Sequence, residues 1–219
     1  MTLQTLPLFP LTTMLFPDGL LPLQIFELRY LNMVKKCIAE GTEFGVVAQT
    51  ARRDAAAESP AASGGNAPAL PMSQETFSAV GTTAKIVSHF VPQPGLIRVD
   101  CVGGQRFSIV STQQQAGGLW VAQVQTIAAD LAIPVPAELL DAVTALRHVI
   151  STLASQATEN SFMPIAKPYF FDDCGWVANR WCELIPMQPA QRHRLLTLDN
   201  PLIRLELVQD LLETGGFLR

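Results

Sequence analysis

The first thirty residues contain three apolar runs separated by turn-forming residues. The runs are Leu6-Pro7-Leu8-Phe9-Pro10-Leu11, Leu15-Phe16-Pro17 and Leu21-Pro22-Leu23-Gln24-Ile25-Phe26-Glu27-Leu28-Arg29-Tyr30. Between the second and third runs, Pro17-Asp18-Gly19 combines a preset φ, a side chain that tolerates turn geometry and a glycine that accepts positive φ. The stretch therefore predicts the order strand, turn, strand, helix.

The helix is indicated by apolar side chains that recur at helical spacing, namely Phe26, Tyr30, Val34, Cys37 and Ile38. Gly41 stands where a helix of this length would end. In the first strand, Pro7 and Pro10 cannot donate to a β ladder. We therefore expect that strand to lie at a sheet edge or to be interrupted.

Strand patterns continue to residue 127, with one stretch of different amino-acid composition. Residues 51–74 are rich in Ala, Ser, Gly and Pro, which predicts a long flexible loop joining two strands as an expanded hairpin. Further strands are expected over 77–90, 95–102, 106–111 and 119–127, with Gly81 as a candidate bulge and turns at Gly103-Gly104 and Gly117-Gly118. Several short strands separated by turns suggest a small closed or nearly closed β-barrel.

Helical patterns take over after Asp130. An apolar stripe runs from Leu139 to Leu153. Asp172 or Asp173 is suited to cap the next helix, and Asn200-Pro201 has the cap-then-proline order of a helix start. We expect an α+β fold in which residues 1–130 form the β-barrel subdomain and residues 134–219 form a helical bundle.

Composition excludes several classes of function. The 219 residues are 48% hydrophobic and carry 15 basic and 19 acidic side chains, a net charge of −4. Nucleic acids and anionic lipids select strongly basic surfaces, so we expect neither as a partner. No apolar stretch is long and clean enough to cross a bilayer. The four cysteines form no Cys-x-x-Cys pair and the three histidines stand apart, so we expect reduced cytoplasmic thiols, no metal site and no cofactor.

The chain resembles the N-terminal domain of Lon proteases along nearly its whole length. The resemblance is carried by Leu6-Pro7-Leu8-Phe9-Pro10, Phe16-Pro17, Leu21-Pro22-Leu23, Ile25-Phe26-Glu27, Arg29-Tyr30, Gly81-Thr82 and Gly103-Gly104-Gln105-Arg106-Phe107, and less tightly by Leu184-Ile185-Pro186 and residues 191–195. It implies a PUA-like β pseudo-barrel followed by a helical subdomain. In the full-length protease this domain helps to capture substrates and to assemble the ring.

The enzymatic parts of that family have no counterpart in this sequence. It contains no Gly-x-x-x-x-Gly-Lys-Ser/Thr phosphate loop, and its four lysines do not stand in a serine-lysine peptidase segment. We therefore expect a stand-alone member of the family, without ATPase and peptidase domains.

Candidate catalytic groups have simpler structural interpretations. Cys174 and Cys182 could act as nucleophiles with His148 or His193 as the base, but they fall within a predicted helix and are interpreted as packed structural thiols. We interpret the neighbouring carboxylates near residue 172 as a helix cap rather than as a hydrolase pair. Glu27 and Arg29 are interpreted as an ion pair that ties the first helix to the barrel.

We therefore expect a non-catalytic module that captures unfolded polypeptide segments or a specific protein partner in an apolar cleft between the two halves. Five side chains are candidates for the apolar surface: Phe9, Phe16, Leu20, Phe26 and Tyr30. Packing inside the barrel is the alternative for most of them. Two other functions stay open: a small-molecule-binding protein or enzyme with a pocket between the halves, and an RNA-binding PUA-like domain.

Overall fold

The opening of the chain folds in the expected order. In the computed structural model, which describes residues 3–52, 75–157 and 163–218, strand β1 (Leu3–Leu11) leads through a turn to β2 (Leu20–Ile25) and then to helix α1 (Leu28–Glu40). Gly41 ends α1 in the left-handed conformation, with a φ of 64°, the geometry that favours glycine at a helix C-terminus. The remaining strands are β3 (Phe44–Arg52), β4 (Glu75–Gln93), β5 (Leu96–Gln114) and β6 (Trp120–Thr126).

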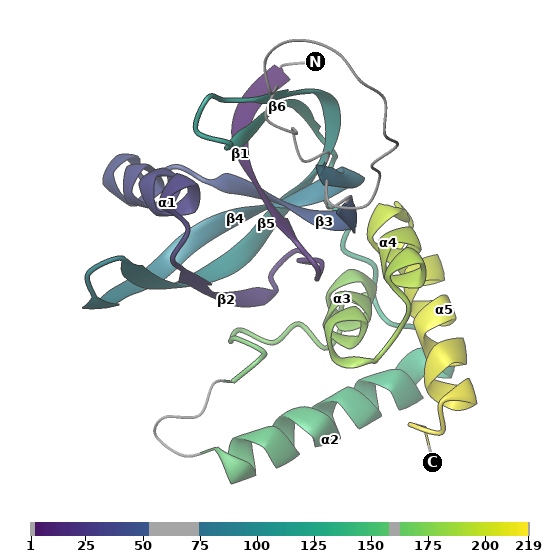
Figure 1. The fold of residues 1–219 in the computed structure, drawn as a ribbon. Coiled ribbons are helices and arrows are strands. Elements are labelled where there is room, and N and C mark those ends of the chain that lie inside the picture. Colours follow the sequence, from purple (N-terminus) through teal and green to yellow (C-terminus); the bar gives the residue numbers. More distant parts are fainter. Residues whose placement is uncertain (1–2, 53–74, 158–162, 219) are drawn as a thin grey trace, which may run out of the picture.

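The strands form a ring in the upper part of Figure 1. The sheet order is β2-β5-β4-β3-β1-β6, and a further pairing of β6 with β5 closes it. The segment expected as a long loop falls between β3 and β4, which pair antiparallel up to Arg52 and Glu75. Residues 53–74 lie outside the described residues, while 51 and 52 belong to β3.

β1 is interrupted, because its two halves pair with different strands. Its first half, Leu3–Pro7, pairs antiparallel with β6, and its second half, Leu8–Leu11, pairs parallel with β3. The strand changes partner directly after Pro7, which has no N–H to donate.

The predicted turn at Gly103-Gly104 is wrong. β5 runs straight through both glycines, whereas the turn at Gly117-Gly118 is confirmed, with Gly118 at a φ of 80°. The glycine at 103 is needed for close approach: a Cβ there would overlap the backbone carbonyl of Phe16. Backbone hydrogen bonds of 2.8 Å join Gly103 to Asp18 and Gly19. A similar need for space explains Gly81, where a Cβ would overlap the Val46 carbonyl.

The helices that follow β6 lie together on one side of the strands, below and to the right of them in Figure 1. They are α2 (Leu140–Gln156), which follows the short 3-10 helix η1 (Ala137–Leu139), α3 (Cys174–Leu184), α4 (Pro189–Thr197) and α5 (Pro201–Thr214). Asp173 caps α3 by accepting from the Trp176 N–H at 2.7 Å, and Asn200 caps α5. The α+β class, with a ring of strands followed by helices, is confirmed; the division at residues 130–134 into two subdomains stays a prediction.

The connection between β1 and β2 joins the two parts. Leu15 packs into the core beneath α1 and the strands. Its neighbour Phe16 is fully buried in the core formed by the helices. Arg180 of α3 donates to the Pro17 carbonyl at 2.7 Å, and it pairs with Glu183 one turn further on, at 2.9 Å between Nε and Oε2. Glu183 in turn bonds the backbone of Phe16.

We predict that Gly103→Ala destabilises the fold. A methyl group at this position must push β5 away from the β1–β2 connection, and overpacking of this kind costs about 1–3 kcal/mol. Gly117→Ala is the matched control, because nothing lies within 4 Å of a Cβ at that position. Urea unfolding of both variants measures the effect. An unchanged midpoint for Gly103→Ala would contradict the close approach.

We also predict that Glu183 makes stability depend on pH. Burial raises the pKa of Glu183 from 4.5 to about 7, although Arg180 opposes the shift. The folded state therefore holds a proton that the unfolded state releases, so this contribution to stability is present below pH 4.5 and is lost as pH rises through 7. We expect the unfolding free energy of the wild type to fall relative to that of Glu183→Gln as pH rises from 5 to 8. Urea unfolding of both proteins across this range measures the difference. A constant difference would contradict the raised pKa.

Candidate functional site

β2 is attached to the ring of strands through β5 and does not pair with β1. Among the described residues, β2 pairs only with β5, and the second half of β1 pairs only with β3. The side of Leu8–Leu11 that faces away from β3 and the side of Leu20–Ile25 that faces away from β5 are thus two unpaired strand edges. Unpaired edges of this kind are templates for pairing with another chain.

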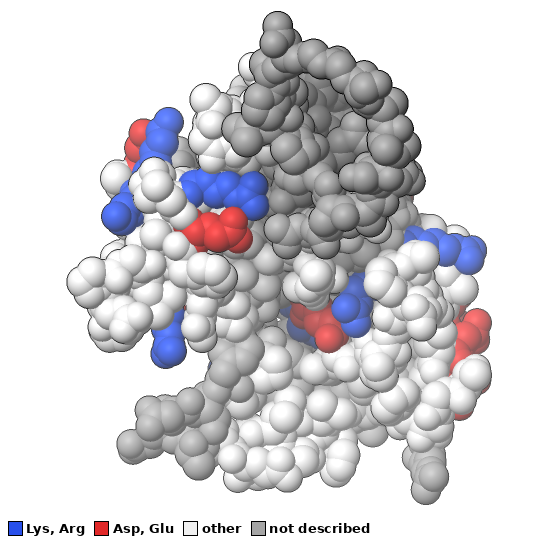
Figure 2. All heavy atoms as spheres, viewed as in Figure 1, with Lys and Arg blue, Asp and Glu red and all other residues white. Residues whose placement is uncertain are grey.

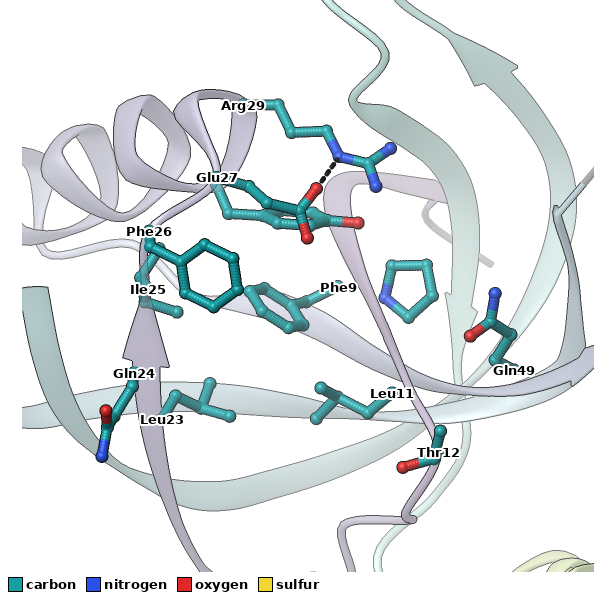
Figure 3. A pocket seen from close by; sticks show the side chains of 12 residues that line it. Phe9, Leu11, Thr12, Leu23, Gln24, Ile25, Phe26, Glu27, Arg29 and Gln49 are labelled. Atoms are coloured by element: carbon teal, nitrogen blue, oxygen red, sulfur yellow. Dashed lines mark hydrogen bonds and ion pairs between the residues drawn. The ribbon is translucent and has the colours of Figure 1, made fainter. Parts of the chain in front are cut away.

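A hollow of about 290 Å³ lies between these edges, and we call it the slot. Figure 3 shows Phe9 and Leu11 of β1 on one wall and Leu23 and Ile25 of β2 on the other, with Phe26 at the end of β2. The remaining lining residues are Pro10, Thr12, Gln24, Glu27, Arg29, Tyr30 and Gln49. The walls are apolar because alternate residues of both strands face inward.

Polar groups close the end of the slot nearest α1. The Nε of Arg29 lies 3.0 Å from Oε2 of Glu27, the interaction drawn as a dashed line in Figure 3. Nη1 of Arg29 donates to the Gly118 carbonyl at 3.0 Å, and its guanidinium lies 4.6 Å from the centre of the Tyr30 ring. Arg29 therefore ties the start of α1 to the turn between β5 and β6 through its hydrogen bond to Gly118, whereas its ion pair with Glu27 stays within the start of the helix.

The five predicted binding residues are not all brought together. Phe9, Phe26 and Tyr30 line the slot; Phe9 and Tyr30 are buried, with ring centres 4.2 Å apart, and Phe26 is 71% exposed. Phe16 is fully buried among the helices, and Leu20 is half-buried outside the slot lining.

Sequence reasoning did not single out Leu11, Leu23 and Gln49, which also line the slot. Leu11 stands two residues after Phe9, and Leu23 stands two residues before Ile25. Strand periodicity therefore carried the signal for both leucines. Gln49 comes from β3, and only the pairing of β1 with β3 places it there.

A second hollow, of about 590 Å³, lies between the strands and the helices, and we call it the cleft. Its walls come from the β1–β2 turn, the middle of β5, the segment after β6 and the start of α3. The lining residues are Pro17, Asp18, Gly103, Gly104, Gln105, Arg106, Ala128, Ala129, Asp130, Ala132, Phe170, Asp172, Asp173, Gly175, Trp176 and Asn179. None of the five predicted binding residues is among them, although this is where the sequence placed the binding cleft.

Buried charges hold the cleft together. Arg106 and Arg204 are 4% and 1% exposed, and Asp130 accepts from both, at 2.9 Å from Arg106 Nη2 and 2.5 Å from Arg204 Nη1. Arg106 also donates to the Leu196 carbonyl at 2.9 Å, and both arginines donate to the Leu198 carbonyl. Burial lowers the pKa of Arg106, and Asp130 opposes that shift.

The thiols near the cleft are poor nucleophiles. Burial raises the pKa of Cys174 to about 11 and that of Cys182 to about 12, and the thiolate is the reactive form. Within the described ranges, histidine, cysteine and carboxylate side chains form no group of three that could hold a metal ion.

The charged surface offers no continuous basic area on the face shown in Figure 2. Blue and red side chains there lie in small groups of both signs, and uncharged residues cover most of the rest of the described surface. Of the helices in the part of the chain that the structure describes, none is both long and apolar enough to span a membrane.

Known proteins share this fold. Residues 5–214 match the family model of the ATP-dependent protease La (LON) substrate-binding domain. A Lon N-terminal domain protein from Xanthomonas campestris is 26% identical, with a TM-score of 0.66 over 94% of this chain and 98% of the other. The N-terminal domain of Mycobacterium avium complex Lon protease is 13% identical, with a TM-score of 0.57 over 94% and 97% of the two chains, and shows the same fold.

The curated relatives are longer proteins. Protein cereblon of Danio rerio is 30% identical over 130 residues, which is 58% of this chain and 26% of that protein. Protein cereblon of Gallus gallus is 28% identical over 128 residues, 57% of this chain and 24% of that protein. The matched region thus spans about a quarter of each cereblon.

We predict that Asp130→Asn destabilises the protein by about 3 kcal/mol, because it leaves two buried arginines without their shared counter-charge. Asp199→Asn is the matched control. Asp199 also pairs with Arg106, at 3.4 Å, but is 84% exposed, so its loss should cost less than about 1 kcal/mol. Chemical unfolding of both variants at neutral pH tests the difference; equal losses would contradict the central role of Asp130.

Proposed function

The chain belongs to the family of the ATP-dependent protease La (LON) substrate-binding domain, and we propose that it recognises extended apolar polypeptide segments in the slot without acting on them chemically. The observation that carries the proposal is the opening between β1 and β2, where two unpaired strand edges face each other across apolar side chains. The family description supports a polypeptide as the ligand.

An extended segment suits both features of the slot. Backbone groups of a bound strand can pair with an unpaired edge, and alternate side chains can enter the apolar walls, the mode known as strand addition. A folded protein keeps its strands paired internally, so an unfolded segment is the better ligand. All four cysteines are free thiols, which supports placing this activity in the cytoplasm.

Phe26 is the expected anchor for the segment. Its side chain is 71% exposed although it borders an apolar hollow, so a bound segment would remove a large aromatic surface from water. Burial of such a side chain contributes about 1.5–3 kcal/mol, which corresponds to at least a tenfold change in affinity. Truncation of Phe26 removes little from the folded core, since the ring already faces solvent.

We predict that Phe26→Ala weakens binding of a labelled, permanently unfolded model polypeptide at least tenfold in a fluorescence anisotropy titration. The folded form of the same polypeptide is the ligand control. Phe90→Ala is the matched variant: Phe90 is 63% exposed and does not line the slot, so its loss should leave affinity unchanged. Thermal melting of both variants should match wild type. Equal affinities for all three proteins, or equal binding of the folded ligand, would contradict recognition in the slot.

A further inference from the structure

The last part of β4 has an unpaired edge that carries exposed apolar side chains. Ala84 is the last residue of β4 that pairs with β3, and beyond it the strand pairs only with β5 among the described residues. The hairpin of β4 and β5 projects at the lower left of Figure 1, away from α3, α4 and α5. All five residues from Val87 to Val91 are exposed. The three large apolar ones, Val87, Phe90 and Val91, are 56%, 63% and 55% exposed.

This edge lacks the charged side chains that usually protect unpaired strands. No aspartate, glutamate, lysine or arginine stands between Lys85 and Arg98. Such side chains discourage pairing, because the bare N–H and C=O groups of an edge readily bind another strand. The ladder with β5 is regular from Ser88 to Phe90 and shifts on either side, and Pro92 has no N–H to donate. Residues 87–91 therefore form a short, uncharged edge that is open to pairing.

The sequence of this edge is complementary to itself. A dimer with two-fold symmetry brings the same surface of both copies together. When two copies pair antiparallel about an axis at His89, Val87 lies opposite Val91 of the second copy, and Ser88 lies opposite Phe90. The two phenylalanines then lie on a diagonal, within reach of each other. Each valine thus meets a valine, and no residue of the edge faces a charged side chain.

The charges of the neighbouring strand are also complementary across the axis. In β5, Arg98 pairs with Phe90, and Asp100 pairs with Ser88. In the symmetric dimer, each row of side chains across the four central strands begins with Arg98 of one copy and ends with Asp100 of the other. Each row therefore carries one charge of either sign, and the pairing meets no like-charge repulsion. This match favours a second copy of the chain over an unrelated strand.

We propose that the edge of β4 is a self-association site, at which two copies pair antiparallel about His89. The strands β2, β5 and β4 of each copy then form one continuous sheet. Five residues a side are far fewer than the 20–30 or so of a stable interface, so the dimer exchanges with the monomer. The slot lies beyond β2, at the other edge of these three strands, so the pairing leaves it open and the proposal does not depend on it.

Sedimentation equilibrium of the full chain over a range of concentrations tests the association. We expect a reversible monomer–dimer equilibrium. Val91→Lys sets a charge opposite Val87 of the second copy and should weaken the dimer at least tenfold, with an unchanged melting temperature because the side chain is exposed. Val110→Lys is the matched control: Val110 is 56% exposed and belongs to the part of β5 that pairs with β6.

Two outcomes of sedimentation would overturn the proposal. One is equal dimerisation of wild type and both variants. The other is a chain that stays monomeric at every concentration, which would leave the edge to a strand of another protein.

Single cysteines test the predicted register. The four native cysteines are buried, so an introduced thiol is the one that reacts. Residue 89 of one copy faces residue 89 of the other, so His89→Cys should form a disulfide-linked dimer when an oxidant is added. Lys85→Cys is the matched control, because Lys85 is exposed on the same strand but lies several residues from the axis. It should cross-link at least tenfold more slowly. Equal rates, or a dimer that does not cross-link at residue 89, would overturn pairing about His89.

Discussion

The structure depends on how eight residues between β1 and β2 are held. Leu15 and Phe16 are adjacent in sequence, yet one enters the core of the strands and the other the core of the helices. The backbone of this connection accepts hydrogen bonds from a strand and from a helix. Thr82 of β4 donates to the Leu15 carbonyl at 2.6 Å, and Arg180 of α3 donates to the Pro17 carbonyl. Neither part of the protein can shift against the other without exposing one of these two side chains.

Buried arginine side chains fix how the strands and the helices are oriented relative to each other. An apolar contact tolerates sliding, but a buried guanidinium must keep several acceptors in fixed directions. Arg106 of β5 donates to the carbonyls of Leu196 and Leu198, at the end of α4. It thereby joins the strands to the helices. The same network positions Asn179 through Arg204. The cleft therefore has a rigid floor, whereas the slot is bordered by strand edges with no ladder between them among the described residues.

Sequence patterns predicted most of the fold and three of the residues that line the candidate slot. Proline placement, apolar periodicity and cap residues predicted the order of elements, a cap at Asp172 or Asp173 and a cap at Asn200, because these signals act locally. The turn predicted at Gly103-Gly104 failed because glycine also serves close packing, and only the fold reveals that the β1–β2 connection crosses β5 there. Phe9 and Phe16 look alike in sequence. Their separation into two cores follows from long-range packing, which no local pattern encodes.

The prolines that identify the opening also shape what the slot can do. Pro10 on one strand and Pro22 on the other have no N–H, so neither residue can donate a backbone hydrogen bond to an incoming strand. Natural sheets use proline in this way to prevent uncontrolled pairing with other chains. Under the proposed strand addition, a bound segment would lack the hydrogen bonds that these two N–H groups would donate and would depend more on its side chains for affinity. If the slot binds extended segments as proposed, this arrangement would favour reversible binding of many apolar sequences over tight binding of one.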